Sequence, residues 1–409
     1  MAFPIYRLQI VAFVDLLAVG LIVPLVPRHV REMGGNQIHV GLLGSIYAGF
    51  QLGSGPLIGS LSDLKGRKVV LIMTLLISSI AYACLGLTNS IVCVLIIRAI
   101  LGLFKQTQVL TKALVPDYES NHQYQGDIYG KMAAISGAGI TLGPAIGGHI
   151  AEDHPQNGFT YIALIVCLCF AFNAGLVYFL PKPSVRLHKR KSTYKIEQRN
   201  LICQVSTSIR QSFVELYKIK WSKYWDIFLL KALVGFAMGV YYTNYELYLR
   251  TTYNLSSKYV GYVISFQGII GSISSFFIGY INSFYSHDND YSLRNFHVFL
   301  LLSISLLGML LSFNVIMYTI WLIPLAIGNA VARLITLEMI LKRSHNDHRG
   351  KLIGASNSIR SLAGVIAPIV SGFIGQYFGL TYVLCASLFS TTVGVALSYQ
   401  YRSKMIKTD

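Results

Sequence analysis

Several ionisable side chains lie inside or at the end of long apolar runs of this sequence, where a charge is costly, among them Asp15, Arg98, Glu246 and Glu338. On insertion scales, a charge at the centre of a membrane-crossing helix costs about 2.5–3.5 kcal/mol, so each one requires a physical reason. A carboxylate removed from water takes up a proton closer to neutral pH, whereas an arginine keeps its charge. We therefore expect these residues to be the candidates for coupling proton movement to another process.

Asp15 lies near the centre of the first apolar run, and two interpretations of it remain open. Its carboxylate could take up and release a proton, or it could only cap a neighbouring helix or pair with an arginine. Arg98, with Gly102 one turn further on, is the candidate to bias this proton, because a buried arginine needs a polar partner. Lys105 lies too deep in the same run to reach the membrane surface easily.

Charged residues of the second half also have a structural explanation. Glu246 and Arg250 are spaced i,i+4, which favours a helical ion pair at the outer end of a helix. The tyrosines around this pair are expected to form an interfacial belt, although they could also line a solute entry: Tyr241, Tyr242, Tyr245 and Tyr248. Arg333, Glu338 and Arg360 could form an inner gate.

The elements that must position these residues are membrane helices. Of the 409 residues, 54% are hydrophobic and only 12% are charged, which excludes an ordinary soluble protein. Runs of about 20 apolar residues match the thickness of a bilayer core. We count twelve of them: 8–27, 40–61, 69–88, 91–110, 132–150, 159–180, 226–249, 260–281, 296–313, 315–337, 356–377 and 381–399. The sequence predicts an all-α membrane protein with twelve transmembrane helices, the first retained rather than cleaved.

The net charge of +17 is concentrated in particular loops. The segment 181–223 carries eleven Lys or Arg against two Glu, whereas the loops of opposite parity are poor in Lys and Arg. Because basic loops stay on the cytoplasmic side, both termini are predicted to be cytoplasmic, and the charge indicates topology rather than nucleic-acid binding. Three parts follow: a six-helix bundle at 1–180, a basic cytoplasmic linker at 181–224 with an amphipathic helix at 206–216, and a second six-helix bundle at 225–409.

A short hydrophilic turn separates the second and third runs and contains Gly59, Asp63, Gly66, Arg67 and Lys68. It resembles the loop between helices 2 and 3 of the major facilitator superfamily, except that Leu64 replaces the usual arginine. The resemblance implies a secondary transporter built from two six-helix pseudo-repeats. It also implies a gate, in which Asp63 faces the positive N-terminal end of helix 11 and Arg67 reaches Asp117.

A second motif lies in the fifth run and combines small residues with a proline: Gly139, Gly143, Pro144, Gly147 and Gly148. It resembles the superfamily's helix 5 signature, which is associated with antiporters, and it recurs in degenerate form between Ala363 and Gly372. Proline bends a helix and glycine allows close approach. We therefore expect helix 5 to press on helix 8 at the seam between the halves.

The first run also resembles helix 1 of the bacterial tetracycline/proton antiporters, which carry an aspartate at the place of Asp15. Arg98 followed by Gly102 matches the superfamily's helix 4 signature, and this resemblance implies a role for the arginine in proton release. Two short segments, 102–108 and 173–175, resemble instead an orphan animal branch of the superfamily.

Three features depart from the antiporter pattern. Ala81 and Tyr82 stand where the family has an acidic residue in helix 3, and the ninth run has no carboxylate. The repeat of the gate motif after Gly279 lacks its aspartate and its basic pair. These departures weaken the inference of proton exchange without changing the expected fold.

The sequence favours a secondary active transporter that exports a small organic solute in exchange for protons. The alternatives are an uncoupled facilitator of the same fold and a receptor or scaffold that transports nothing. The expected partners are a neutral or cationic organic solute, protons and the lipid bilayer, and the protein is expected to be a monomer. The sequence predicts no enzyme constellation, no cofactor and no metal site.

Overall fold

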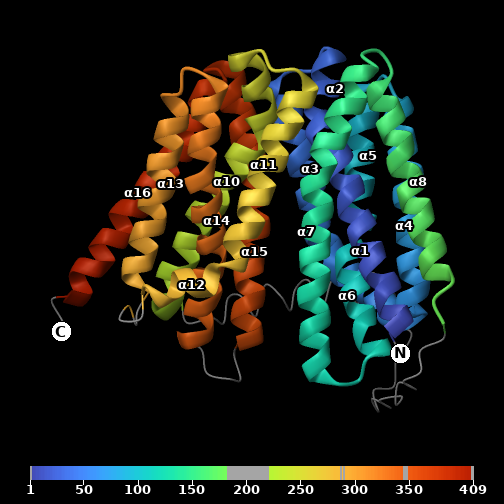
Figure 1. Ribbon diagram of the computed structural model, residues 1–409, viewed down its shortest axis with the longest axis horizontal. Coiled ribbons are helices and arrows are strands. Elements are labelled where there is room, and N and C mark those ends of the chain that lie inside the picture. Colours follow the sequence, from blue (N-terminus) through green and yellow to red (C-terminus); the bar gives the residue numbers. More distant parts are fainter. Residues whose placement is uncertain (1, 182–220, 286–287, 289–290, 344–348, 407–409) are drawn as a thin grey trace. The chain divides into compact units, whose positions relative to one another are not determined.

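The structure is a computed structural model that describes residues 2–181, 221–285, 288, 291–343 and 349–406. Most of the basic linker, including the amphipathic helix expected at 206–216, lies outside these residues. In the described part of the chain the regular elements are all helices (Figure 1). The apolar runs fold in this way because a helix satisfies its own backbone hydrogen bonds, which lipid cannot do.

The elements before the linker are α1 (Ala2–Ile22), η1 (Val23–Leu25), α2 (Val26–Glu32), α3 (Gln37–Lys65), α4 (Arg67–Leu87), α5 (Ile91–Phe104), α6 (Thr107–Tyr118), α7 (His122–Asp153) and α8 (Gly158–Tyr178). Those after it are α10 (Trp221–Tyr253), α11 (Ser257–Phe276), α12 (Ile278–Ser283), α13 (Ser292–Leu310), α14 (Val315–Arg343), α15 (Arg349–Tyr377) and α16 (Leu380–Ile406). Three groups form single broken segments: α1 with η1 and α2, α5 with α6, and α11 with α12. Counted over the described residues, the helices then give the twelve segments that the sequence predicts.

Nine of these segments, within the described residues, are long and apolar enough to cross a membrane by composition alone. The other three contain α3, α7 and α11, the glycine-rich helices of the second, fifth and eighth runs. Their length is sufficient, since α3 has 29 residues and α7 has 32. Glycine and polar residues lower their hydrophobicity, and the same small residues allow close helix packing.

The chain divides into two compact units. Unit 1 comprises residues 1–26 and 50–217, and unit 2 comprises residues 27–49 and 218–409. The helix α3 contributes to both units, because its first part packs with the second half of the chain. Each unit is described by itself below.

In unit 1, α1 packs along α7 and α4 packs along α8 (Figure 1). The contact of α1 with α7 requires glycine: a Cβ at Gly143 would lie 2.6 Å from the Cα of Gly20, and one at Gly139 would lie 2.6 Å from the carbonyl oxygen of Phe13. Within unit 1 the close partner of these glycines is therefore helix 1. The expectation that helix 5 presses on helix 8 stays a prediction. The helix itself continues without interruption through Pro144.

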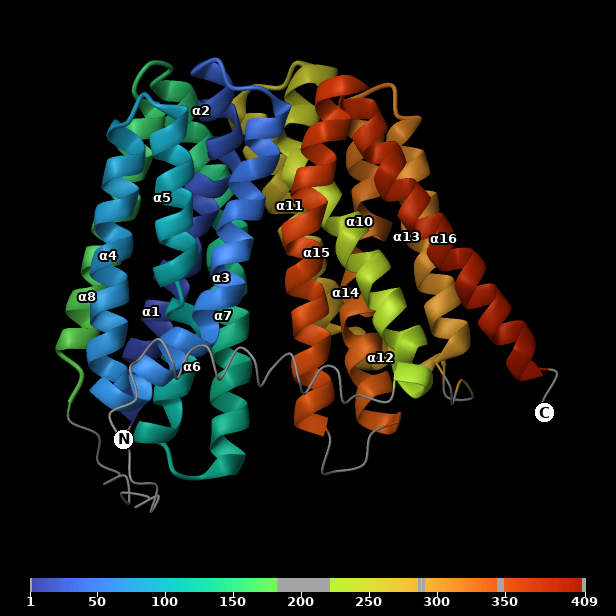
Figure 2. The same ribbon diagram turned by 180° about the vertical axis from the view of Figure 1, so that it is seen from behind.

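In unit 2, α10 packs against α15 and α16, and α13 lies beside α14 and α16 (Figure 2). Val240, Ala367 and Val383, from α10, α15 and α16, form a buried hydrophobic cluster at this contact. Burial of aliphatic side chains and tight packing hold these helices together.

The first part of α3 packs closely on α15. A Cβ at Gly44 would lie 3.0 Å from the ring of Pro368, so the two helices approach as closely as the absence of a side chain allows. The Oγ of Ser45 donates a hydrogen bond of 2.6 Å to the carbonyl oxygen of Val365. Small residues thus allow helix 2 to pack closely on helix 11.

Candidate functional site

A buried ion pair in unit 1 joins α1 to the segment that follows α5. The Nζ of Lys105 lies 3.2 Å from Oδ1 of Asp15. The Asp15 side chain is fully buried, and that of Lys105 is only 7% exposed. Because removing each charge from water costs several kcal/mol, a pair at this depth is stable only with further polar partners.

Gln108 is the second polar partner of Asp15. Its Nε2 donates hydrogen bonds to Oδ2 of the carboxylate at 2.9 Å and to the carbonyl oxygen of Ala12 at 3.2 Å. Both carboxylate oxygens are therefore hydrogen-bonded. The Nζ of Lys105 also lies 5.6 Å from the ring centroid of Phe170, a cation–π distance that stabilises the buried ammonium.

The pair forms at a break in the fourth membrane segment. Lys105 (ψ 70°) and Gln106 (φ −109°, ψ 25°) leave the helical conformation between α5 and α6. The continuous helix expected over 91–110 is therefore wrong. The Nε2 of Gln106 holds the break by donating to Oγ of Ser54 at 2.8 Å and to the carbonyl oxygen of Gln51 at 3.3 Å, both on α3. Irregular backbone at membrane depth is tolerated where protein satisfies it in this way.

Arg98, the expected partner of Asp15, is also buried and lies on α5. The cation that contacts the Asp15 carboxylate is Lys105, so a role for Arg98 in biasing the proton remains a prediction. The sequence shows that Lys105 is deep in an apolar run. It does not connect this lysine to Asp15, because that contact depends on the break and on the packing of α1.

The turn between α3 and α4 has the geometry that its motif predicts. Gly66 adopts φ +93°, a conformation that is strained for any residue with a side chain. The Nη1 of Arg67 donates to Oδ1 of Asp117 at 3.1 Å and to the carbonyl oxygen of Ala113 at 2.7 Å. The predicted Arg67–Asp117 contact is thus confirmed, and Asp63 adds a weaker one, 3.7 Å from Nη2 of Arg67.

Two further residues of the motif are Lys68, which makes a hydrogen bond, and Gly59, which has open space around it. The Nζ of Lys68 donates a hydrogen bond of 2.7 Å to the carbonyl oxygen of Leu180. A Cβ at Gly59 would meet nothing within 4 Å, so this glycine is not required by a close contact in unit 1. The contact expected between Asp63 and helix 11 remains a prediction.

Unit 2 carries a charge cluster at the corresponding place, between α12, α13 and α14. The Nη1 of Arg294 lies 3.7 Å from Oε2 of Glu338, and its Nε lies 3.3 Å from Oδ2 of Asp288. Asn282 donates to Oε1 of Glu338 at 3.0 Å and accepts from Arg294 at 3.3 Å. Burial and the Glu338 carboxylate raise the pKa of the nearby Tyr291 hydroxyl.

The arginine–carboxylate contact of the gate motif therefore recurs in unit 2, although the sequence of the motif is lost there. Arg294, at the start of α13, reaches Glu338 near the end of α14, as Arg67, at the start of α4, reaches Asp117 near the end of α6. The partners of Glu338 in this cluster are Arg294 and Asn282. The inner gate expected from Arg333, Glu338 and Arg360 stays a prediction.

Glu246 is buried at the other end of unit 2, with 3% of its surface exposed. Its Oε1 lies 3.9 Å from Nη1 of Arg250, so the predicted pair forms. Its Oε2 has no hydrogen-bond partner among the described residues. Arg250 also donates to Oγ of Ser257 at 3.1 Å, and the same hydroxyl accepts a hydrogen bond from Arg28 on α2. These contacts tie the end of α10 to α2 and α11.

The tyrosines near Glu246 form a cluster, and the expectation of an interfacial belt is wrong for Tyr241 and Tyr248. Tyr241, Tyr248 and Tyr318 are almost fully buried, and the rings of Tyr248 and Tyr318 stack with centroids 5.9 Å apart. Tyr242, in contrast, is 42% exposed and packs edge-to-face on Tyr241 at 5.1 Å. The cluster therefore presents one phenol at the surface of unit 2.

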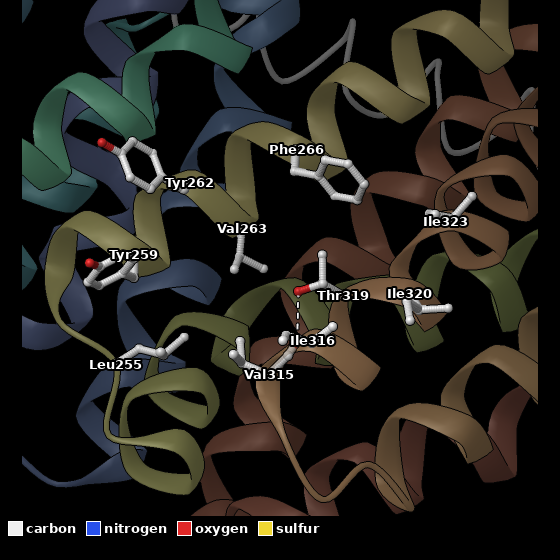
Figure 3. Close-up of a pocket in the computed structure, with 10 residues that line it drawn as sticks. All are labelled: Leu255, Tyr259, Tyr262, Val263, Phe266, Val315, Ile316, Thr319, Ile320 and Ile323. Carbon is white, nitrogen blue, oxygen red and sulfur yellow. Dashed lines mark hydrogen bonds between the residues drawn. The ribbon is translucent and has the colours of Figure 1, made fainter.

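An apolar groove of about 300 Å³ lies between α11 and α14 (Figure 3). The side chains of Val263 and Phe266 face it from α11, and the hydroxyl of Thr319 donates to the carbonyl oxygen of Val315 at 2.7 Å. With no charged side chain in its lining, this groove suits an apolar chain and cannot orient a charged solute. The described residues also bring together no group of His, Cys, Asp and Glu able to hold a metal ion.

Comparison with known proteins agrees with this geometry. Residues 8–368 match the Major Facilitator Superfamily. The chain is 24% identical to the quinolone resistance protein NorA of Staphylococcus aureus, with 99% of each protein covered. It is 26% identical to the class D tetracycline resistance protein of Salmonella ordonez, over 89% of this chain and 88% of that protein.

A solved structure shows the same fold. It is a bacterial homologue of the human lysosomal transporter Spinster in an inward-facing, unoccupied conformation. The TM-score is 0.80 at 13% identity, covering 99% of this chain and 98% of the other. Since the family match spans most of the sequence, the chain is a multi-pass membrane transporter of the Major Facilitator Superfamily and not an enzyme.

Proposed function

We propose that the protein is a secondary active transporter that exchanges a small organic solute for protons by alternating access. The observation that carries this proposal is the buried pair of Asp15 and Lys105. A carboxylate at membrane depth is expensive as a permanent charge but tolerable as one that gains and loses a proton. The names of the two resistance proteins, for quinolones and tetracycline, support a solute of similar size and aromatic character.

The Asp15–Lys105 pair would couple proton movement to solute movement through a change in its net charge. When Asp15 takes up a proton, the attraction to Lys105 is lost and the ammonium remains as an uncompensated buried charge. Breaking a buried pair in this way costs about 3–5 kcal/mol. Movement of the 105–106 break would relieve this cost by bringing Lys105 to water. Proton uptake would thus favour one conformation of the bundle, and proton loss would favour the other.

The two arginine–carboxylate pairs would act as latches on this change. Arg67 with Asp117 in unit 1 and Arg294 with Glu338 in unit 2 each join the start of one segment to the end of another. Partly exposed pairs of this kind contribute little to stability, about 0–1 kcal/mol, so they can open during each cycle. Asp63 would complete the first latch by facing helix 11.

Three further features belong to the same proposal. The basic loops support cytoplasmic termini. Glu246, with its unsatisfied Oε2, is the second candidate for a proton site. The resemblance of 102–108 and 173–175 to an orphan animal branch stays a prediction, as does the monomeric state.

Transport by purified protein in proteoliposomes tests the proposal. The solute is first chosen from a panel of metabolites and amphiphilic drugs, including tetracycline and a quinolone, as the compound that most raises the unfolding temperature. A coupled exchanger accumulates this solute only when a pH gradient is imposed and loses the effect when an ionophore collapses the gradient. Equilibration that ignores the gradient identifies an uncoupled facilitator, and binding without flux identifies a receptor or scaffold.

A further inference from the structure

Three cationic side chains come together in unit 2: Lys231 on α10, Arg333 on α14 and Arg360 on α15. Lys231 donates a hydrogen bond to Oγ of Ser356, one turn before Arg360 on α15. Asn329, one turn before Arg333 on α14, donates to the Tyr242 hydroxyl on α10 at 3.1 Å, so the three cations lie near contacts between packed helices. Among the described residues, no carboxylate lies within salt-bridge distance of any of them. The acid of α14, Glu338, is paired with Arg294 instead. The region therefore holds like charges without internal compensation.

The cluster lies at membrane depth, where an excess of positive charge needs a physical reason. All three residues lie within the membrane-spanning stretches 224–253, 315–340 and 354–377. Arg333 and Arg360 are nevertheless exposed at the surface of unit 2. A guanidinium is stable at membrane depth where water can reach it, so we expect this surface to border a water-filled path. A path lined by one sign of charge attracts ions of the opposite sign.

An aromatic ring and amide groups lie beside the cations. Tyr242 lies on α10, and its hydroxyl contacts α14 and α11. Its oxygen accepts hydrogen bonds from Nδ2 of Asn329 at 3.1 Å and from Nε2 of Gln267 at 3.4 Å. These bonds and the edge-to-face contact with Tyr241 fix the exposed ring in place. The cluster thus combines a positioned aromatic face with two guanidinium groups.

We infer that Lys231, Arg333, Arg360 and Tyr242 form an anion subsite of the solute-binding path, which takes an aromatic carboxylate or sulfonate. The planar guanidinium groups bind the acid, with bidentate geometry that a carboxylate matches, and Tyr242 packs against the aromatic ring. This inference rests on the proposed transport function. It replaces the neutral or cationic solute expected from the sequence with an organic anion.

Equilibrium binding tests the subsite without a pH gradient. The protein is placed in phosphatidylcholine nanodiscs, and three naphthyl probes of one shape are titrated by calorimetry: 2-naphthoate, the neutral 2-naphthamide and the cationic 2-naphthylmethylammonium. We expect the carboxylate to bind about ten-fold or more tightly than the amide, because hydrogen bonds to charged groups are the stronger ones. The ammonium should bind most weakly. Equal affinities, or no binding of 2-naphthoate, overturn the inference.

Matched variants assign the selectivity to these residues. Arg333→Gln and Arg360→Gln should each weaken 2-naphthoate about ten-fold while leaving 2-naphthamide nearly unchanged. Arg31→Gln removes the same charge from an exposed arginine whose Nη1 donates to the Gly35 carbonyl at 3.1 Å, and it should change neither affinity. An equal loss in Arg31→Gln means that net charge, rather than the subsite, attracts the anion.

Two further measurements control for misfolding of the variants and for occupation of the cluster by a lipid headgroup. Arg360→Glu should reverse the preference so that the ammonium binds better than the carboxylate, a gain that a misfolded protein cannot show. If phosphatidylglycerol in the nanodisc abolishes binding of 2-naphthoate, the cluster holds a lipid headgroup and the inference is wrong. Binding in nanodiscs is measured without a pH gradient, so loss of carboxylate selectivity and absence of proton-coupled transport in proteoliposomes are separate results.

Discussion

Lys105 and Asp15 form their ion pair at the one place where the fourth membrane segment, among the described residues, stops being helical. The backbone turn at 105–106 lets Lys105 and Gln108 reach the same carboxylate, one at each oxygen. Asp15, whose charge would change on protonation, is thereby connected to a membrane segment whose helix is already interrupted. Such a connection is what a transporter needs to convert protonation into movement.

Removing the lysine should reveal how much the pair contributes. Lys105→Met leaves Asp15 buried without a cation and should lower the free energy of unfolding by about 3–5 kcal/mol. Adding Asp15→Asn to Lys105→Met should recover part of this loss, since the uncompensated charge is gone. Chemical unfolding of the purified protein in detergent measures both effects.

The matched control for this change is Lys131→Met. Lys131 also pairs with an aspartate, Asp127 at 3.7 Å, but both side chains are mostly exposed. Its loss should cost only about 0.5 kcal/mol or less. Similar losses at Lys105 and Lys131 would show that the buried pair has no special place in the fold.

The packing of α7 on α1 predicts a difference between two glycines of one helix. Gly143→Ala places a Cβ 2.6 Å from the Cα of Gly20, and it should destabilise the protein by about 1–3 kcal/mol through overpacking. Gly137→Ala, where nothing lies within 4 Å, should be neutral or slightly stabilising because alanine favours a helix. Thermal unfolding compares them, and equal shifts would contradict the helix 1 contact.

The two latches predict coupling within each unit. Double-mutant cycles for Arg294→Gln with Glu338→Gln, and for Arg67→Gln with Asp117→Asn, should give interaction energies of about 0.2–1 kcal/mol. Each single variant, and Asp63→Asn, should also change the transport rate by altering the balance between conformations. Coupling without any change in rate would show that the pairs are only structural.

An alanine in place of Gly66, in the turn of the gate motif, is expected to be strained. Gly66→Ala should cost about 1–2 kcal/mol, because φ +93° is unfavourable for a residue with a Cβ. Gly59→Ala, in the helix before it with open space around it, should not destabilise. The unfolding midpoints of the two variants test this prediction. An unchanged midpoint in Gly66→Ala would mean that the turn rearranges freely.

Local patterns were sufficient for the helices and for the short-range contacts. Apolar runs predicted the twelve segments, since length and hydrophobicity alone determine whether a helix can cross a bilayer. The i,i+4 spacing of Glu246 and Arg250 predicted their contact. The gate motif predicted the pair of Arg67 and Asp117 because a known family supplied the long-range partner.

Contacts that depend on tertiary structure could not be predicted in this way. The break at Lys105 and Gln106 contains neither glycine nor proline, and it is held by bonds to Ser54 and Gln51 on another helix. The pair of Arg294 and Glu338 was missed because the motif was sought directly after Gly279, whereas Arg294 lies beyond that segment, at the start of α13. Spacing along the chain carries no signal for such pairs.

The central claim is that Asp15 carries the coupled proton, and the Asp15→Asn variant in proteoliposomes tests it most directly. The variant should still exchange solute across the membrane at equal concentrations, because asparagine keeps the shape of the site. It should fail to concentrate solute when a pH gradient is imposed, since it has no proton to exchange. If Asp15→Asn concentrates solute as the parent does, the proton is carried elsewhere and the account is wrong.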